Sequence, residues 1–493
     1  MASLNEILSL CKAGEGQKAY ELSKADMEQQ FPWAQREMGW TLYYLLKDDT
    51  DRNDFQSLIT HLDEFSTLNQ LSMTDDSMIY ENVLFKVAGF VKERISPKDI
   101  SSPAKLSSLF AKLHGFNFNP SKAYSFLLKS FIKCDSWQEM ADFIDWWNLD
   151  NLTQEDYTPY KTEDGKTIMS VAEQVFIAKS KALLRLNDLG RTEEFLPKMD
   201  ELMEKHPEMT YPGYFYGKLL LSLGSNADDA LRVIVPFARK KASEFWVWQL
   251  LSDVFANEQE KQLACLLRAV HCHTKENFLG KVRIKLAALY ILRNQYDYAK
   301  HQINQITQCY LSQGWHLPYE VDCWARQPWI NTVAPNSGSP IDYMIITNGI
   351  LCEGTEEAIA VVTYVDSNSH KVNLVYGYKK HISQKLRSKV GHGMVLKINY
   401  VSEPDGKIRI LSSSQTQFTD GLDYAKVVEG KARKRTDKDF AFLKAKEGEY
   451  YISPNVVRKY GIQDGDVVKG LIVYDYNKKK EEWDWTCISI NKK

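Results

Sequence analysis

The hydrophobic period of the sequence changes once, and this change divides the chain into two kinds of structure. Up to about residue 312, apolar residues recur at every third and fourth position, which predicts α-helices. After the stretch TVAPNSGSP, rich in Pro, Gly and Ser, apolar and polar residues alternate, which predicts β-strands. A chain of 493 residues is also too long for one ordinary core. We therefore expect a multidomain protein, helical first and β afterwards.

The β part predicts two small barrels in tandem. The strand-like runs are AIAVVTYVD, KVNLVYGY, MVLKINYV and KIRILSSS, followed by YAKVVEGKARKR, DFAFLKA, EYYISP, VVKGLIVYDY and WDWTCISI. Two successive sets of short strands, the second with five runs, are typical of five-stranded OB-like barrels in tandem. The expected domains are a helical region at residues 1–312, a linker at 313–343, and barrels at 344–418 and 419–493.

The end of the helical region contains a repeat of paired helices. Units beginning GYFYGKLLL, FWVWQLLSD and LGKVRIKLA start roughly 31 to 34 residues apart, the period of helical solenoids. The last two resemble tetratricopeptide repeats, with small residues at Ser252, Ala287 and Ala299 where the helices of such a repeat meet. Neither unit has the closing proline of that family, and Arg283 stands where a large apolar residue is usual. The resemblance implies a surface for a protein partner, which the sequence does not identify.

The stretch DFAFLKAKEGEYYISPNVVRKYGIQDGD carries a second resemblance. Its order of elements is Phe-x-Phe-Leu-Lys, an aromatic before Ile-Ser-Pro, a basic-aromatic turn, and Gly-Asp. This order is similar to the cold-shock-type RNA-binding domain of the transcription terminator Rho. The resemblance implies that Phe440 and Phe442 stack on bases, with Tyr451 beside them and Lys444 near phosphate. The family's glycines around the first Phe are replaced by Asp439 and Ala441.

Physical chemistry points to the same residues. The basic run KARKR, which contains Lys431, Arg433 and Arg435, leads directly into the aromatic strand. Single-stranded nucleic acid binds where aromatic faces and positive charge coincide. The alternative is that the rings of this strand fill the barrel. Phe440 and Phe442 share one face of a strand, so Ala441 and Leu443 on the other face are the better core candidates.

Two further sets of aromatic residues remain open. Tyr376, Tyr378 and His381 lie among lysines in VYGYKKHIS of the first barrel. They predict either a second nucleic-acid contact or an ordinary half-buried strand. Trp483 and Trp485 alternate in EEWDWTCISI, so they share a face, and either extend the aromatic platform or close the barrel.

Charge and composition narrow the function class. The net charge is −2, but residues 340–493 hold 25 Lys and Arg against 20 Asp and Glu, a balance of +5, which leaves −7 for residues 1–339. Only the β part therefore favours a polyanion. Eight scattered cysteines and the lack of a signal peptide or long apolar run predict a cytoplasmic protein with reduced thiols and no membrane contact. In CLLRAVHCH, packing inside a helix is favoured over a metal site.

No cofactor motif or catalytic constellation is present in the sequence, and the protein is expected not to be an enzyme. The main hypothesis is an adaptor whose barrels bind single-stranded RNA or DNA and whose helical repeats bind a protein. The alternatives are a pure protein-interaction scaffold and an enzyme with an unrecognised site in the helical domain. The sequence leaves RNA versus DNA, base preference and oligomeric state open.

Overall fold

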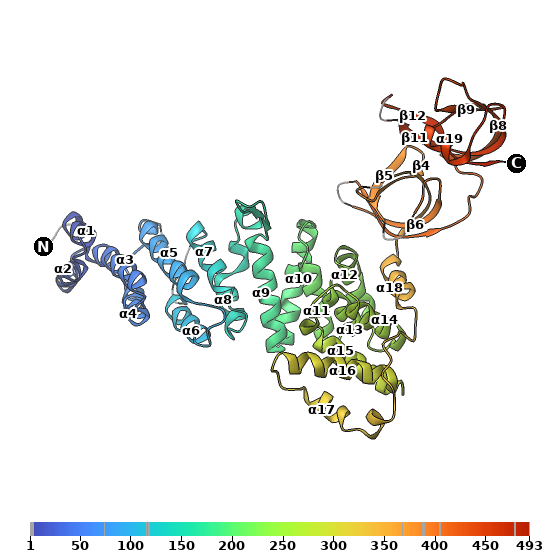
Figure 1. The fold of residues 1–493 in the computed structure, drawn as a ribbon. Coiled ribbons are helices and arrows are strands. Elements are labelled where there is room, and N and C mark those ends of the chain that lie inside the picture. The colour runs from blue at the N-terminus through green and yellow to red at the C-terminus, as the bar shows by residue number, and fades with distance from the viewer. Residues whose placement is uncertain are drawn as a thin grey trace. The chain divides into compact units, whose positions relative to one another are not determined.

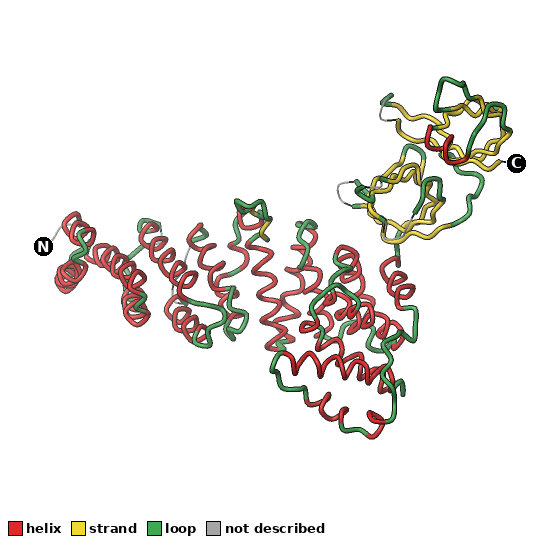
Figure 2. Tube along the Cα trace, viewed as in Figure 1, coloured by secondary structure: helices red, strands yellow, loops and turns green. Residues whose placement is uncertain are grey.

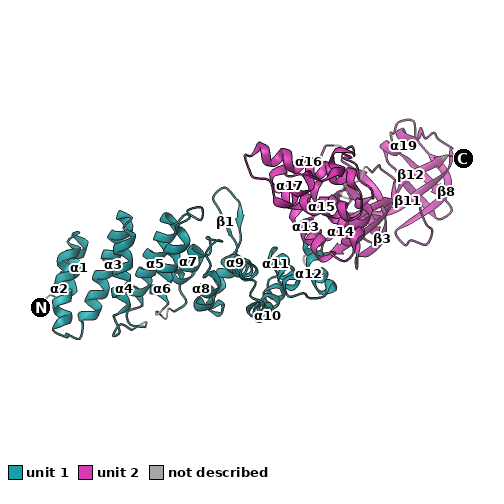
Figure 3. Ribbon diagram, turned by 90° about the horizontal axis from the view of Figure 1, so that it is seen from below, with its two compact units in different colours: residues 1–237 teal, residues 238–493 magenta. Residues whose placement is uncertain are grey.

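The computed structural model describes residues 4–72, 74–114, 116, 119–366, 368–386, 390–403, 406–477 and 480–492. The chain forms two compact units, residues 1–237 and 238–493 (Figure 3). As predicted, helices come first and β-sheets follow (Figure 2). Within the described ranges, no helix is long and apolar enough to cross a membrane.

The first unit is a stack of helices (Figure 1). Its elements are α1 (Leu4–Lys12), α2 (Gly16–Glu28), α3 (Ala34–Arg52), α4 (Phe55–Ser66), α5 (Ser77–Arg94), α6 (Ser102–Leu113), α7 (Lys122–Phe131), α8 (Met140–Trp147), α9 (Val171–Leu186), α10 (Leu189–Lys205) and α11 (Pro212–Ser222), with α12 (Ala227–Lys240) ending just past the boundary. Helices α3, α5, α7, α9 and α11 pack successively against one another, and α4 packs on α6 in a second row. A short hairpin, β1 (Tyr160–Lys161) and β2 (Thr167–Ile168), precedes α9.

The tryptophans of the first unit belong to its core. Trp137 and Trp147 are fully buried. The Trp147 ring stacks on Tyr124 at 4.5 Å between centroids, and each residue donates a side-chain hydrogen bond to the other's carbonyl oxygen, at 2.8 and 3.1 Å. Buried indole and phenol donors are thereby satisfied. Trp137 and Trp147 are therefore core residues of the first unit.

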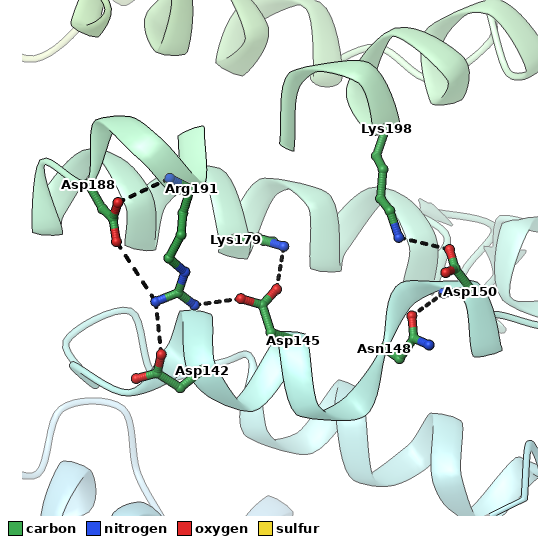
Figure 4. Close-up of polar contacts among 8 residues, drawn as sticks. All are labelled: Asp142, Asp145, Asn148, Asp150, Lys179, Asp188, Arg191 and Lys198. Carbon is green, nitrogen blue, oxygen red and sulfur yellow. Dashed lines mark hydrogen bonds and ion pairs between the residues drawn. The ribbon is translucent and has the colours of Figure 1, made fainter. Parts of the chain in front are cut away.

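An ion-pair network joins α8 to α9 and α10 (Figure 4). The Asp145 carboxylate accepts from Lys179 at 2.5 Å and from Arg191 at 2.6 Å, and Arg191 also reaches Asp142 at 2.8 Å. Burial of Asp145 raises its pKa, but the hydrogen bonds and charges of Lys179 and Arg191 outweigh that effect and lower the pKa overall. The network therefore links α8 to α9 and α10 through ion pairs.

The second unit begins with paired helices. They are α13 (Phe245–Val254), α14 (Gln259–Val270), α15 (Gly280–Leu292) and α16 (Tyr296–Ser312); α13 packs on α14, α15 on α16, and α14 on α15. Ser252, Ala287 and Ala299 are fully buried, as close approach of paired helices requires. Arg283 is buried, and the cost of burying its charge is offset because its guanidinium donates to Gln302 at 2.6 Å and to Glu276 at 3.0 Å. Helix pairing is observed, whereas membership of the tetratricopeptide family stays a prediction.

The segment predicted as a linker is partly ordered. Residues 313–343 include α17 (Tyr319–Ala325) and the 3-10 turn η4 (Pro328–Asn331), which pack on α16 and bury Val321. Helix α18 (Tyr343–Cys352) follows and packs on α14. The first strand of the β part begins after it, at Glu356. The enrichment of Pro, Gly and Ser in TVAPNSGSP indicated the end of the helical region, but no sequence pattern predicted these short helices.

The first sheet forms from β3 (Glu356–Val365), β4 (Lys371–Gly377), β5 (Lys380–Lys385), β6 (Val395–Ser402) and β7 (Ile408–Gln415). In the described residues its order is β5-β4-β3-β6-β7, a half-barrel sheet consistent with the predicted OB-like domain, in which β5 and β7 are not paired with each other. One side chain bridges the gap. The Gln384 amide of β5 donates to the Ile410 carbonyl of β7 and accepts from the Ile410 N–H, each at 3.1 Å.

The second sheet is the predicted closed barrel. It consists of β8 (Ala425–Arg433), β9 (Ala441–Ala445), β10 (Gly448–Ile452), β11 (Val467–Asn477) and β12 (Glu482–Lys492), with α19 (Pro454–Tyr460) between β10 and β11. The order β10-β12-β11-β8-β9 closes through the β9–β10 pair, and β10 runs parallel to β12. The first sheet repeats this order except for the β10–β12 pair, which has no counterpart among its described strands, and the repeated order confirms the duplicated strand pattern.

The first sheet and the barrel share a hydrophobic cluster. Val361 and Val375 of the sheet pack with Leu471 and Val473 of β11. The Tyr424 hydroxyl, just before β8, donates to a carbonyl oxygen of β3. The first sheet and the barrel therefore share apolar contacts within the second unit.

A buried acid in the first unit makes stability depend on pH. Glu37 of α3 is 1% exposed, and no hydrogen-bond partner within the described structure reaches its carboxylate oxygens. Burial is the main cause that raises the pKa of Glu37, and repulsion from the nearby carboxylate of Asp26 adds to it, so that the pKa is about 7. Glu37 is therefore protonated in the folded chain at pH values where the unfolded chain has lost that proton.

We predict that the free energy of unfolding falls as the pH rises from about 5 to 8, by on the order of 2 kcal/mol, because the folded state must then ionise a buried group. The contribution is fully present below the ordinary pKa of a glutamic acid and is lost as the pH passes 7. Urea denaturation at several pH values measures it. Glu37→Gln should remove most of this slope, and an unchanged slope in the variant would contradict the assignment.

Candidate nucleic-acid interface

Strand register brings the predicted aromatic and basic residues to one face of the barrel. Phe442 of β9 lies opposite Tyr451 of β10 on one side and opposite Arg433 of β8 on the other. One step along the same face, Lys444 lies opposite Lys431 of β8. Side chains directly opposite in a sheet point to the same side. The outer surface of β8, β9 and β10 therefore carries these residues in two adjacent rows.

Three rings form a contiguous group on this surface, which we call the aromatic face: Phe440, Phe442 and Tyr451. The centroid of Phe440 is 5.7 Å from that of Phe442 and 5.6 Å from that of Tyr451, and Phe442 lies 6.0 Å from Tyr451. The rings are inclined to one another by 47° to 87°, so they do not cover each other's faces. Phe442 is 36% exposed, and the other two are half-buried.

The core of the barrel is filled from the opposite side of the same strands. Ala441, Leu443, Tyr450 and Ile452 are buried and pack together. The alternative that Phe440, Phe442 and Tyr451 are the core of the barrel is therefore wrong. One ring of the stretch, Tyr450, does serve the core, and its neighbour Tyr451 faces outward because successive residues of a strand alternate.

Positive charge borders the aromatic face. Lys431, Arg433 and Lys444 are exposed, and no ion pair links any of them to another residue in the part of the chain that the structure describes. Arg435 differs, because it lies in the connection from β8 to β9 and pairs with Asp437 at 3.2 Å. Three of the four predicted cations thus lie beside the rings without an ion pair among the described residues, although Glu449 of β10 lies opposite Lys444 in the register.

The other residues of the Rho-like pattern have structural roles here. Ser453 caps α19 by accepting a hydrogen bond from the Val456 N–H at 3.4 Å, and Pro454 occupies the first helical turn, where its missing N–H costs nothing. The N–H of Gly465 donates to the Ala432 carbonyl at 2.8 Å, which ties the turn before β11 to β8. These residues hold the strands that present the aromatic face.

A glycine allows β8 to approach β9 closely. A Cβ atom on Gly430 would lie 2.2 Å from the carbonyl oxygen of Lys444, a distance that no side chain tolerates. This position keeps Lys431 and Arg433 on β8 next to the rings of β9.

The structure places the predicted residues of the first sheet elsewhere. Tyr376 is partly buried and packs edge-on against Tyr400, with ring centroids 5.6 Å apart, as in an ordinary half-buried strand. The Tyr378 ring stacks on Tyr474 of β11 at 5.2 Å, and His381 stacks on Tyr476 at 6.0 Å. The rings of Tyr378 and His381 therefore contact β11 of the barrel and not the aromatic face. Contact of Tyr376, Tyr378 and His381 with nucleic acid stays a prediction.

Trp483 and Trp485 complete a second group of rings at the junction of the two sheets. Across the β11–β12 register, Tyr474 lies opposite Trp485 and Tyr476 opposite Trp483. The Trp483 ring is also 5.4 Å from His381. These tryptophans therefore pack where the β11–β12 hairpin meets the first sheet. Sequence reasoning found their shared face but missed Tyr474 and Tyr476, because the register of β11 with β12 and the stacking on Tyr378 and His381 of the first sheet are known only from the structure.

Cys265 and His271 of CLLRAVHCH have different packing environments. Cys265 is fully buried in α14, where burial raises the pKa of its thiol. The His271 ring instead stacks on Tyr343 at the start of α18, with centroids 4.9 Å apart. Both residues therefore have packing roles in the second unit.

Comparison with known families gives two matches. Residues 426–490 match the family described as S1/CSD-like domain 2 of the TOTE conflict systems. Residues 210–343 match a domain of unknown function (DUF7017). No curated protein matches the chain. The first match covers nearly the whole barrel, including the aromatic face, and confirms the cold-shock-like type of the C-terminal domain; the resemblance to Rho itself stays a prediction.

We predict that the double variant Phe440→Leu/Phe442→Leu keeps the thermal stability of the barrel within about 1 kcal/mol, since the rings lie outside its core. Leu443→Ala should instead destabilise it by about 2–5 kcal/mol, because Leu443 is fully buried. Thermal unfolding of the full chain measures both. The reverse order of stabilities would place the phenylalanines inside the barrel.

Proposed function

We propose that this protein is a cytoplasmic, non-catalytic adaptor whose C-terminal barrel binds single-stranded nucleic acid, RNA in preference to DNA. One observation carries the proposal: three clustered outward-facing rings, bordered by three cations without ion pairs, lie on a barrel that matches an S1/CSD-like family. A soluble domain ordinarily buries phenylalanine, so rings left outside the core favour a ligand with flat apolar faces.

The geometry suits bases that are splayed rather than stacked on one another. Phe440, Phe442 and Tyr451 are mutually inclined, so each offers a face in a different direction. Base–aromatic stacking contributes about 1–3 kcal/mol per base and tolerates any base. Lys431, Arg433 and Lys444 would meet the phosphates between the bases. Binding with little sequence preference follows, because stacking and phosphate contacts do not read base edges.

The adaptor role rests on the helical part. The paired helices α13–α14 and α15–α16 present surfaces of the kind on which helical repeats bind peptides or proteins. A protein partner held there would be brought to the nucleic acid held by the barrel. The proposal requires no chemical step.

We predict that Phe440→Leu/Phe442→Leu weakens binding of a labelled oligouridylate of about twelve nucleotides by at least 30-fold, because two stacking faces are lost. Fluorescence anisotropy with the full-length chain measures the affinity. Tyr364→Leu is the matched control, since Tyr364 is a 51% exposed ring on β3 of the first sheet. Equal affinities of the double variant and the wild type would contradict the proposed face and favour a pure protein-interaction scaffold.

The basic residues predict a salt dependence. Each phosphate contact on a single strand contributes about −0.7 to the slope of log affinity against log salt. Lys431→Gln/Arg433→Gln should therefore make the slope shallower by about 1.4. Lys469→Gln is the control, because Lys469 on β11 already lies 3.9 Å from Glu429. A slope that is the same in wild type and double variant would show that these cations do not contact phosphate.

A further inference from the structure

A cavity of about 460 Å³ lies within the second unit, away from the aromatic face. Its walls come from the residues that end α12, from α18, and from β5 and β7 of the first sheet. The volume falls in the range of small-molecule sites, about 300–1,000 Å³. The cavity is therefore large enough for a ligand of the size of a nucleotide.

Positive charge dominates the lining. Arg239, Lys240, Lys385 and Arg409 all border the cavity, and no Asp or Glu is among the described residues that do. Of these four, Arg409 pairs with Glu403 at 2.7 Å, and no ion pair reaches the other three from the described residues. Burial, together with the facing charge of Arg409, lowers the pKa of Arg239. The cavity thus holds more positive charge than the protein neutralises, which favours an anionic ligand.

Two guanidinium groups are fixed in place before any ligand arrives. Arg239 donates to the carbonyl oxygens of Leu351 at 2.8 Å and Glu353 at 2.5 Å. Arg409 donates in turn to the Arg239 carbonyl at 3.2 Å. The Nε of Arg409 is buried, and none of the described groups accepts its hydrogen bond. A guanidinium held in place in this way is suited to phosphate, because its planar array of N–H donors matches the arrangement of the phosphate oxygens.

The remaining wall is apolar and contains one unused amide. Met344, Leu351, Leu386 and Ile410 supply hydrocarbon surface. The Asn348 side chain on α18 borders the cavity, and no hydrogen bond occupies its amide within the described structure. An amide can donate to and accept from the edge of a base, while hydrocarbon packs against its face.

We propose that this cavity binds a nucleotide, with the phosphates held by Arg239, Arg409, Lys240 and Lys385 and the base packed on the apolar wall beside Asn348. The site is separate from the aromatic face and does not depend on the function proposed for it. The same phosphate chemistry could be supplied by a free nucleotide or by the phosphorylated end of a strand.

Isothermal titration of the full-length chain with ATP, ADP, AMP and adenosine tests the proposal. Affinity should rise with the number of phosphates, and adenosine should bind at least tenfold more weakly than ADP. The double variant Lys240→Ala/Lys385→Ala removes two exposed lysines, so its fold is preserved, and it should bind ATP at least tenfold more weakly. Lys397→Ala, which changes an exposed lysine that pairs with Glu357 and does not border the cavity, should bind ATP as the wild type does.

Two results would overturn the proposal: no heat with any of the nucleotides, or the same ATP affinity in the double variant and the wild type. A second arm compares oligonucleotides with and without a 5′-phosphate. A preference for the phosphorylated strand that is lost in Lys240→Ala/Lys385→Ala would identify the strand end as the source of the phosphate, and its absence would identify the free nucleotide. Phe440→Leu/Phe442→Leu leaves the cavity intact. If this variant loses affinity for the oligonucleotide but keeps its affinity for ATP, the two sites are separate.

Discussion

The strict alternation of side chains along β9 is the constraint on which the proposed interface depends. Ala441 and Leu443 point into the barrel, so Phe440 and Phe442 must point out of it. Ala441 lies opposite Ile452 of β10 and Leu443 lies opposite Tyr450, and these four side chains pack in the core of the barrel. A shift of one residue in register would exchange the two faces, burying the phenylalanines and exposing the leucine. The same alternation therefore determines which side chains fill the core of the barrel and which form its outer aromatic face.

The second constraint is the shared packing of the first sheet and the barrel. The cluster around Val361, Val375 and Val473 buries apolar surface from both, and Tyr378 and His381 extend the contact as stacked rings. This packing explains why two sheets with the same strand order differ in the use of their aromatic residues. In the barrel, the rings of the aromatic face do not pack against the first sheet. In the first sheet, the rings of Tyr378 and His381 in the β4–β5 hairpin stack on β11 of the barrel.

Local patterns allowed the sequence to predict much of this structure. The change of period separated helices from strands, and the Phe-Ala-Phe-Leu alternation identified both faces of β9. Relations between distant segments could not be predicted. The stacking of Tyr378 on Tyr474 joins residues of two sheets, and the charged cavity brings Arg239 together with Lys385 and Arg409, which lie well over a hundred residues further along the chain. Single residues such as Gln384, which bridges the open edge of the first sheet, have no signature in the sequence.

Photocrosslinking tests the central claim most directly. A short single strand that carries 4-thiouridine at every position is bound to the full-length chain, irradiated, and the linked peptides are identified by mass spectrometry. The account predicts that crosslinks concentrate at Phe440, Phe442 and Tyr451, with none at Tyr364. Crosslinks confined to the helical units or to the first sheet, with the aromatic face unlabelled, would contradict it.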